Sequence, residues 1–268
     1  MVLIPGLGFG GDVFEGLVGA FEESHRIWSV TLAGFGGTPP PPVPPPGTSF
    51  GEQTWTESAF RGLEKLLLDE DIRDAVVVGH WLTGARLALD LGAAHPDRVR
   101  AVVLLAGSAR LVRPGTPVPP LAARVAVIDT LMAPRWFKTV TRETWDDNNF
   151  LPQDYAADPV LGLRYWREAA RPRLDVWVRY LCEFYAQDAT EELTRVRVPV
   201  VLLHPGLEGI REDPANPYMR AFTAGSWGES EGRETRVRTI PDTRIVMWAD
   251  RLDAVVQELR AAAAPPGS

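Results

Sequence analysis

The residues with the clearest chemical pattern lie at 76–89, where a short β-branched run enters a tight turn and a helical pattern leaves it at once. Gly79 and Gly84 flank the turn, and position 81 is its tip. Strand-to-helix turns of this kind present the tip residue for nucleophilic catalysis, usually a serine. The residue here is Trp81, whose indole has neither a nucleophilic oxygen nor a titratable group. The sequence therefore predicts the backbone of a nucleophile elbow without its nucleophile.

A histidine would be needed to take a proton from a hydroxyl or a water. The chain has four histidines and none lies beyond His204, which ends an apolar run at 198–203. We keep His204 as a candidate base, with Glu208 to orient it and Asp213 as a competing acid. The alternative is a structural histidine. For His80, beside the tip, we expect a hydrogen-bonded core residue.

The glycine-rich loop at 5–11 follows a buried strand at 2–4. Backbone N–H groups in such a loop can stabilise a developing oxyanion. We expect the amides of Leu7 and Leu82 to form this hole. The alternative is that the glycines only allow close packing. An oxyanion hole without a nucleophile would still stabilise an enolate or a phenolate.

Aromatic residues are dense between 111 and 190, and several could form a cavity in which a flat ligand stacks above Trp81. The alternative is that they pack that region against itself. The candidate ligand-binding side chains are Phe9, His80, Trp136, Trp145, Asn148, Tyr155, Trp166 and Tyr185.

Apolar strands alternate with helical patterns along most of the chain, which predicts an α/β fold with a parallel sheet buried on both faces. The segment between the two strand-containing parts lacks strand patterns and predicts an inserted helical cap. The expected organisation is 1–110 as the first half of the core, 111–190 as the cap and 191–268 as the second half.

The net charge of −7 disfavours nucleic acid and anionic membranes as partners. No apolar run approaches the roughly 20 residues of a membrane span, and no signal peptide pattern is visible. We therefore expect a cytoplasmic protein that binds a small molecule, as a monomer or homodimer. The first strand follows Met1 directly, so a start further upstream stays open. No cluster has metal-ligand spacing, and we expect no metal and no cofactor.

The chain resembles the α/β-hydrolase family over nearly its whole length. The resemblance rests on the order and spacing of segments at 5–9, 30–38, 79–83, 95–100, 192–199 and 240–248. It implies a mostly parallel sheet with helices on both faces and a helical cap. Members usually have two more strands before the one that opens this chain, so those N-terminal strands are apparently absent.

The family's catalytic order is nucleophile, acid, histidine. The chain departs from it at the nucleophile, where Trp81 stands, and at the histidine, expected near 243–246. Arg244 lies at or next to that position, and its guanidinium is always protonated, so it cannot be a base. Glu208 is the best match for the acid. The resemblance thus implies a degenerate triad and excludes Ser–His–Asp hydrolysis.

Three functions remain open. The first is a non-hydrolytic, cofactor-independent enzyme that acts on an aromatic or polycyclic, polyketide-like metabolite by addition, cyclisation or C–C bond formation in bacterial natural-product biosynthesis. The second is a non-catalytic ligand-binding protein. The third is a hydrolase with a relocated base at His204 and Glu208. We expect the first, because the fold and its oxyanion donors remain while the triad is lost.

Overall fold

A single six-stranded sheet forms the core of the computed structural model, which describes residues 1–110, 117–144, 151–207, 223–227 and 235–264. The strand order is β2-β1-β3-β4-β5-β6, and every neighbouring pair is parallel. This confirms the predicted α/β-hydrolase fold class. The strands are β1 (Val2–Ile4), β2 (Trp28–Ser29), β3 (Ala75–His80), β4 (Val99–Leu105), β5 (Val200–Pro205) and β6 (Thr235–Ile240).

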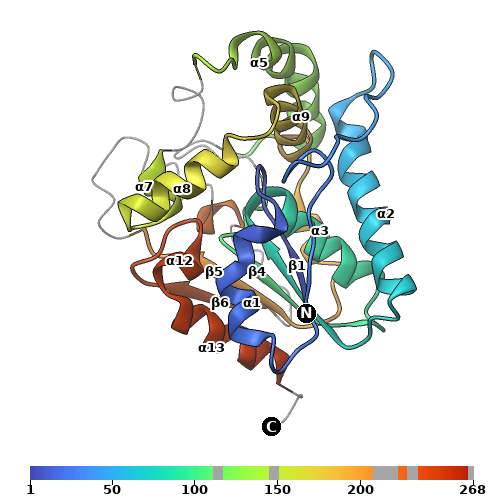
Figure 1. Cartoon of the computed structure of the whole chain (residues 1–268). Helices are drawn as coiled ribbons and strands as arrows, with labels where there is room; N and C mark the ends of the chain where they lie inside the picture. The colour runs from blue at the N-terminus through green and yellow to red at the C-terminus, as the bar shows by residue number, and fades with distance from the viewer. Residues whose placement is uncertain (111–116, 145–150, 208–222, 228–234, 265–268) are drawn as a thin grey trace.

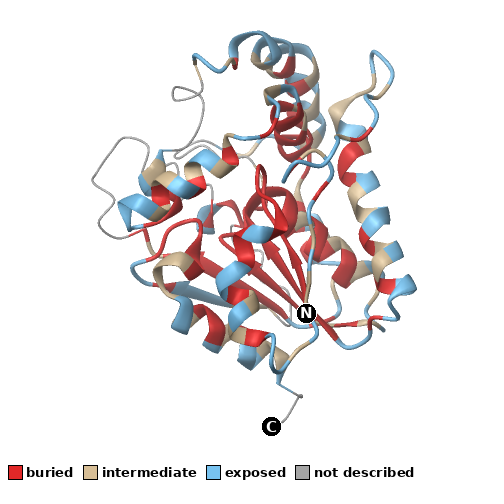
Figure 2. Ribbon diagram, viewed as in Figure 1, coloured by how far each residue is buried: buried red, intermediate tan, exposed pale blue. Residues whose placement is uncertain are grey.

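The central strands are apolar without alternation because helices cover both faces of the sheet. Helices α2 (Thr54–Asp69) and α3 (Trp81–Ala94) cover one face, whereas α1 (Glu15–Phe21) and α13 (Leu252–Ala263) cover the other (Figure 1). The buried residues accordingly concentrate in the strands and in α3 (Figure 2). Short helical segments join these elements: η1 (Gly11–Phe14), η2 (Phe50–Glu52), η4 (Ala224–Ser226) and α12 (Met247–Asp250).

Between β4 and β5 the chain is helical, as expected, and these helices lie above the carboxyl ends of the strands (Figure 1). We call the part from α4 to α9 the cap; whether 111–190 is a unit of its own stays a prediction. No helix within the described ranges is long and apolar enough to cross a membrane. The helices are α4 (Leu121–Val127), η3 (Ile128–Met132), α5 (Ala133–Thr139), α7 (Pro152–Tyr155), α8 (Pro159–Ala169), α9 (Leu174–Tyr185) and α10 (Ala189–Leu193).

Two elements differ from expectation. The strand expected at 26–32 spans only Trp28–Ser29, because the chain leaves this sheet edge after Val30 donates its last ladder bond to Leu3 O at 3.0 Å. The helix expected from Gly84 begins at Trp81. A third expected element, a helix near 219–224, falls mostly outside the described residues.

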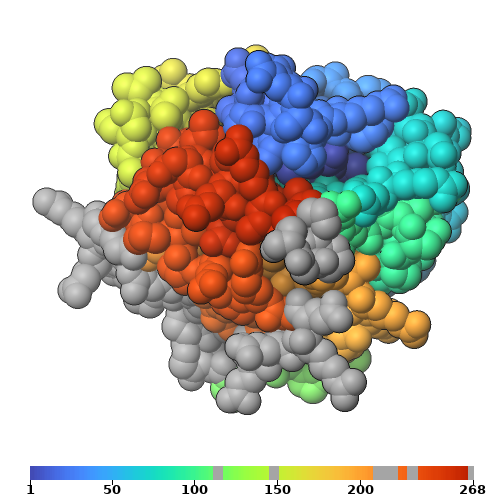
Figure 3. Space-filling model, turned by 90° about the horizontal axis from the view of Figure 1, so that it is seen from below, coloured from blue at the N-terminus to red at the C-terminus, as the bar shows by residue number. Residues whose placement is uncertain are grey.

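The N-terminal and C-terminal parts lie side by side, α1 against α12 and α13 (Figure 3). The Trp248 indole donates to Val13 O at 2.9 Å, and the Arg260 guanidinium lies 5.7 Å from the Phe21 ring centroid. These contacts hold α12 and α13 against the N-terminal part of the chain.

Candidate active site

The predicted elbow is present at the junction of β3 and α3. Trp81 has a φ of 52°, in the left-handed region, which costs a bulky residue about 1–3 kcal/mol. A Cβ at Gly6 would lie 3.0 Å from Trp81 Cβ, so only glycine lets the loop after β1 approach the tip this closely. A strained tip residue pressed against a glycine loop is the geometry that the sequence predicts.

Aromatic rings close the space beside the elbow tip. Trp81 is 1% exposed, and the Tyr155 ring stands edge-on to it at 6.1 Å between centroids. Phe9 packs against Tyr155 at 5.9 Å and is itself 1% exposed. A ligand stacked on Trp81, as the sequence predicts, would have to displace Tyr155.

His80 is a core histidine inside this aromatic cluster. Its Nε2 lies 3.1 Å from Ile245 O, and the Trp248 and Phe14 rings pack on it at 4.9 and 6.2 Å. Burial lowers its pKa to about 3, so the imidazole is neutral and Nε2 donates to the carbonyl. This hydrogen bond also ties the 243–246 segment to the elbow.

Arg244 stands in that segment, where the family resemblance places the histidine. The backbone N–H of the next residue, Ile245, donates to Asp154 O in the cap at 3.0 Å. Arg244 itself is 7% exposed, with its backbone N–H on Asp250 Oδ2 at 2.8 Å and its guanidinium donating to Thr243 O at 3.2 Å. The segment therefore reaches the elbow, and it brings a permanent cation instead of a base.

His204 lies level with the elbow along the carboxyl edge of the sheet. Leu105 of β4 pairs with His80 on one side and with Leu203 on the other. The next residues along the chain therefore form a row across the sheet edge, in the order Trp81, Ala106 and His204. Two strand spacings separate the ends of this row, so Trp81 and His204 lie about 10 Å apart.

The His204 imidazole is 4% exposed, and its Nδ1 has no hydrogen-bond partner among the described residues. Burial lowers its pKa to about 4, which keeps it neutral at physiological pH. In the tautomer that carries its proton on Nε2, the Nδ1 lone pair is not engaged and can accept a proton.

Leu7 and Leu82 flank the tip from two sides. Leu82 is the second residue of α3, so its N–H belongs to the first turn, where amides have no intrahelical acceptor. Leu7 lies in the loop that Gly6 holds against the elbow, and both leucines are fully buried. Both residues therefore lie beside the elbow tip, and the role of their amides as oxyanion donors stays a prediction.

The other aromatic candidates lie further out in the cap. Trp136 of α5 and Tyr185 of α9 pack against each other at 5.5 Å, and Trp166 of α8 is half-buried. Within the described ranges, the ring contacts of these three do not reach Trp81. Three further predicted residues, Trp145, Asn148 and Glu208, lie outside the described residues.

One polar contact between the cap and the core was not predicted from the sequence. The Glu183 carboxylate of α9 accepts from Trp55 N at 3.1 Å and from Thr56 N and Oγ1 at 2.8 Å each, so it caps the start of α2. Its partners are more than 100 positions away, and no local motif announces them. In the described part of the chain no group of three or more His, Cys, Asp and Glu side chains could hold a metal.

Comparison with known proteins places the fold in a family. Residues 1–265 match the model of the alpha/beta hydrolase family. The chain belongs to this family. A hydrolase from Pseudomonas aeruginosa PA01 has the same fold with a TM-score of 0.68 at 14% identity, over 98% of this chain and 89% of the other. An esterase from Exiguobacterium antarcticum gives 0.66 at 14% identity, over 98% and 90%.

A curated relative corrects the expected function. The pimeloyl-[acyl-carrier protein] methyl ester esterase of Aeromonas hydrophila subsp. hydrophila is 25% identical over 225 residues, 82% of this chain and 81% of that protein. This relative is named as an esterase, which supports an enzymatic function and points to hydrolysis. The expectation of a non-hydrolytic enzyme for C–C bond formation on a polyketide-like metabolite is therefore wrong. From the sequence, hydrolysis is only an alternative, because the family's serine and histidine are both missing from their expected positions.

Proposed function

We propose that the chain is a hydrolase that cleaves a carboxylic ester by direct attack of water, with His204 as the general base. The observation that carries this proposal is the row at the carboxyl edge of the sheet, in which His204 stands level with the elbow. The Ala106 side chain between them is a single methyl group. An ester carbonyl seated above Ala106 would have a base on one side and the elbow amides on the other.

Each group in this reaction has a defined role. The carbonyl oxygen accepts hydrogen bonds from the amides of Leu7 and Leu82, which stabilise the negative charge of the tetrahedral intermediate. His204 Nδ1 takes one proton from the attacking water and the oxygen bonds to the carbonyl carbon. As the intermediate collapses, the C–O bond to the alcohol breaks and His204 returns the proton to the leaving oxygen. Acid and alcohol are released and the imidazole is neutral again.

The proposal replaces the Ser–His–Asp triad of the family. Trp81 has no nucleophilic oxygen, and Arg244 cannot act as a base, so both ends of that triad are degenerate. Glu208 is our proposed orienting carboxylate for His204, although it lies outside the described residues.

Access to the row depends on the cap. Trp81, Tyr155 and Ala106 are all almost fully buried, so an ester reaches Ala106 only when side chains that cover the row move, and the Tyr155 ring against the indole is our candidate. Tyr155 ends the short helix α7, whose contacts with the segment before α12 include two backbone hydrogen bonds of 3.0 and 2.9 Å.

The test is hydrolysis of p-nitrophenyl acetate by the His204→Gln variant, which keeps the side-chain volume and removes the base. We expect kcat/KM to fall at least about 100-fold, the range for loss of a general base. In the unmodified protein kcat/KM should be level at neutral pH and fall as the pH drops through about 4, because the imidazole must be unprotonated to act.

The matched control is His95→Gln. His95 follows α3 at the opposite end of that helix and its Nε2 lies 2.8 Å from Glu64 Oε1, so its loss should leave hydrolysis unchanged. Full activity of His204→Gln would overturn the proposed base. Binding of ester analogues without any turnover by the unmodified protein would overturn hydrolysis itself and favour a ligand-binding protein.

A further inference from the structure

A cleft of about 460 Å³ lies between the core and the cap, apart from the sealed elbow. Its walls come from the turn at 8–12 after β1, the loop at 34–40 after β2 and the connection at 168–176 between α8 and α9. Figure 1 shows where these N-terminal loops meet α8 and α9. The volume falls within the range of about 300–1,000 Å³ that small-molecule sites occupy.

Glycines set the shape of this cleft. Gly8 and Gly34 have φ angles of +90° and +94°, and a Cβ at either would come within 3.0 Å of the opposite wall, at Ala169 O and Val176 Cγ1. Gly36 has a φ of +53°, and a Cβ there would lie 2.9 Å from Thr31 Cγ2 and 3.2 Å from Gly10 Cα. Because side chains are missing at these positions, backbone atoms form much of the lining and remain free to contact a ligand.

The walls are held in place by specific contacts. The Arg142 guanidinium donates to Ala170 O and Pro172 O, which fixes the connection between α8 and α9. The Tyr180 hydroxyl of α9 donates to Ala33 O at 3.1 Å, and its ring packs on Phe35 at 5.0 Å. The cleft is therefore a formed feature of the cap–core junction.

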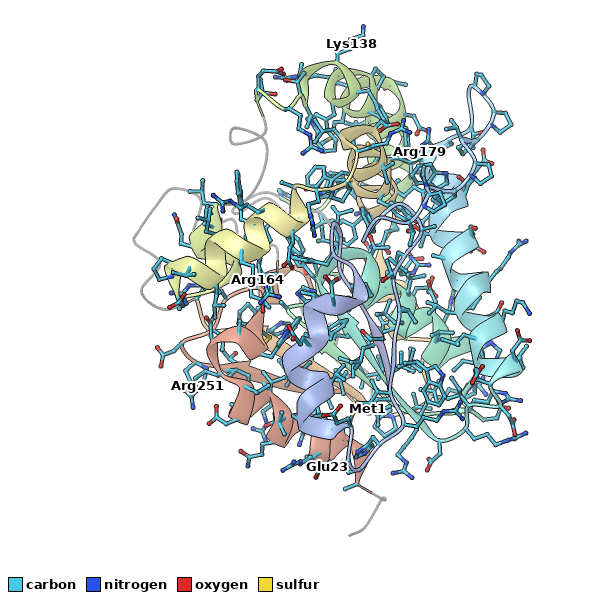
Figure 4. The ribbon with its side chains drawn as sticks, viewed as in Figure 1. Met1, Glu23, Lys138, Arg164, Arg179 and Arg251 are labelled. Carbon is cyan, nitrogen blue, oxygen red and sulfur yellow. The ribbon has the colours of Figure 1, made fainter. Side chains whose placement is uncertain are left out.

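Four charged side chains line the cleft, and two of them are neutralised from outside it. Glu168 bonds Arg164 at 3.0 Å, and the labelled Arg164 points from α8 toward α1 (Figure 4). Arg173 bonds Asp175 at 2.7 Å. The remaining two, Asp12 on the core side and Arg171 on the cap side, have no ion pair among the described residues.

We propose that this cleft binds a zwitterion of amino-acid or dipeptide size, its ammonium group facing Asp12 and its carboxylate facing Arg171. A ligand with only an anionic group would leave Asp12 unpaired, and one with only a cationic group would leave Arg171 unpaired. A dipolar ligand satisfies both unpaired charges at once. Guanidinium is the side-chain group best matched to a carboxylate, which it binds through two parallel N–H donors.

The test uses the dipeptide glycyl-leucine and two blocked forms, the N-acetyl dipeptide and the C-terminal amide, titrated calorimetrically into the full chain. We expect the free dipeptide to bind at least about tenfold more tightly than either blocked form, as loss of one charged hydrogen-bonding group costs about that factor. Arg171→Gln should abolish the discrimination against the amide only. Asp12→Asn should abolish the discrimination against the N-acetyl form only.

Two charge-matched controls lie off the cleft. Arg167→Gln removes an exposed arginine of α8, and Glu23→Gln removes a carboxylate at the far end of α1 (Figure 4). Both should bind like the unmodified protein. Equal affinity for free and blocked dipeptides, no binding at millimolar concentration, or normal discrimination in Arg171→Gln and Asp12→Asn would each overturn the proposal. It does not rest on the proposed hydrolysis, since binding is measured without turnover and none of the four variants alters the row at His204.

Discussion

Trp81 combines a backbone penalty with a large packing contribution. Its positive φ destabilises any residue with a Cβ, while its buried indole contacts Tyr155 and lies beside His80. Loss of a buried tryptophan side chain costs about 3–5 kcal/mol, more than the strain of about 1–3 kcal/mol. The packing free energy of the indole therefore exceeds the backbone strain. Trp81 stabilises the fold as a core residue, whatever its role in ligand binding.

Substitution at this position separates the two effects. Trp81→Ala should lower the free energy of unfolding by about 3–5 kcal/mol, because the cavity is created while the strain stays. Trp81→Gly should be the more stable of the two variants by about 1 kcal/mol, the reverse of the usual order in a helix, because glycine adopts a positive φ without strain. Urea denaturation followed by far-UV circular dichroism measures both. A glycine variant less stable than the alanine variant would mean that the tip is not strained.

At the scale of elements, α3 is tied to α10 and to the end of α9 by a partly buried charge network. Arg86 of α3 donates to Asp90 at 2.8 Å, to Gln187 at 2.6 Å and forms an ion pair with Glu192 at 3.2 Å. Burial raises the pKa of Asp90 to about 6 although Arg86 opposes the shift. The carboxylate is therefore costly to keep charged in the folded state.

The sign of the resulting pH dependence follows from the raised pKa. The folded state favours protonated Asp90. The stabilisation that this gives to the folded state is therefore complete below the ordinary aspartate pKa near 3.8, and it is lost as the pH rises through about 6. The loss amounts to about 3 kcal/mol at 1.36 kcal/mol per pKa unit. In the Asp90→Asn variant, this part of the difference between the unfolding free energies at pH 4 and pH 7 should be missing. The exposed Asp97→Asn serves as control and should follow the unmodified protein; identical curves for all three would contradict the assignment.

Local sequence patterns predicted the elements around the site, but they did not predict the contacts between residues far apart in the chain. The glycines around 79–84 announced the elbow because close packing at that turn admits no side chain. The short β2 was overestimated, since an edge strand ends where the chain turns away and not where its apolar pattern ends. The cleft was missed because Gly8 belongs to one loop and Gly34 and Gly36 to another, and only the folded chain brings the two loops together. The role of Glu183 was missed for the same reason.

For the whole molecule, Glu183 is a principal link between the cap and the core. Its two carboxylate oxygens accept four hydrogen bonds from residues 54–56, and burial raises its pKa while the amides of α2 oppose that shift. Gln53, at the same junction, donates to Glu183 O at 3.2 Å. The Glu183 carboxylate therefore accepts hydrogen bonds from the first backbone N–H groups of α2, because the side chain of the N-cap residue Gln53 does not.

Glu183→Gln should lower the free energy of unfolding by about 1–3 kcal/mol, because an amide NH₂ replaces one oxygen and faces N–H donors. It should also make the cap more sensitive to limited proteolysis, since α9 is held to α2 at this point. Thermal denaturation and digestion with trypsin measure the two effects. Glu191→Gln, an exposed change on α10, is the control. Unchanged stability in Glu183→Gln would show that water replaces the carboxylate without cost.

The packing of α1 on α12 and α13 has a consequence for the synthesis of the chain. Leu17 and Phe21 of α1 are buried in the finished fold, and the indole that bonds Val13 belongs to Trp248, 235 positions later. Contacts of such sequence separation form slowly and only after the distant segment exists. The part of α1 that packs on α12 and α13 therefore stays uncovered until those helices are made, and until then we expect it to be a surface for chaperone binding or for aggregation.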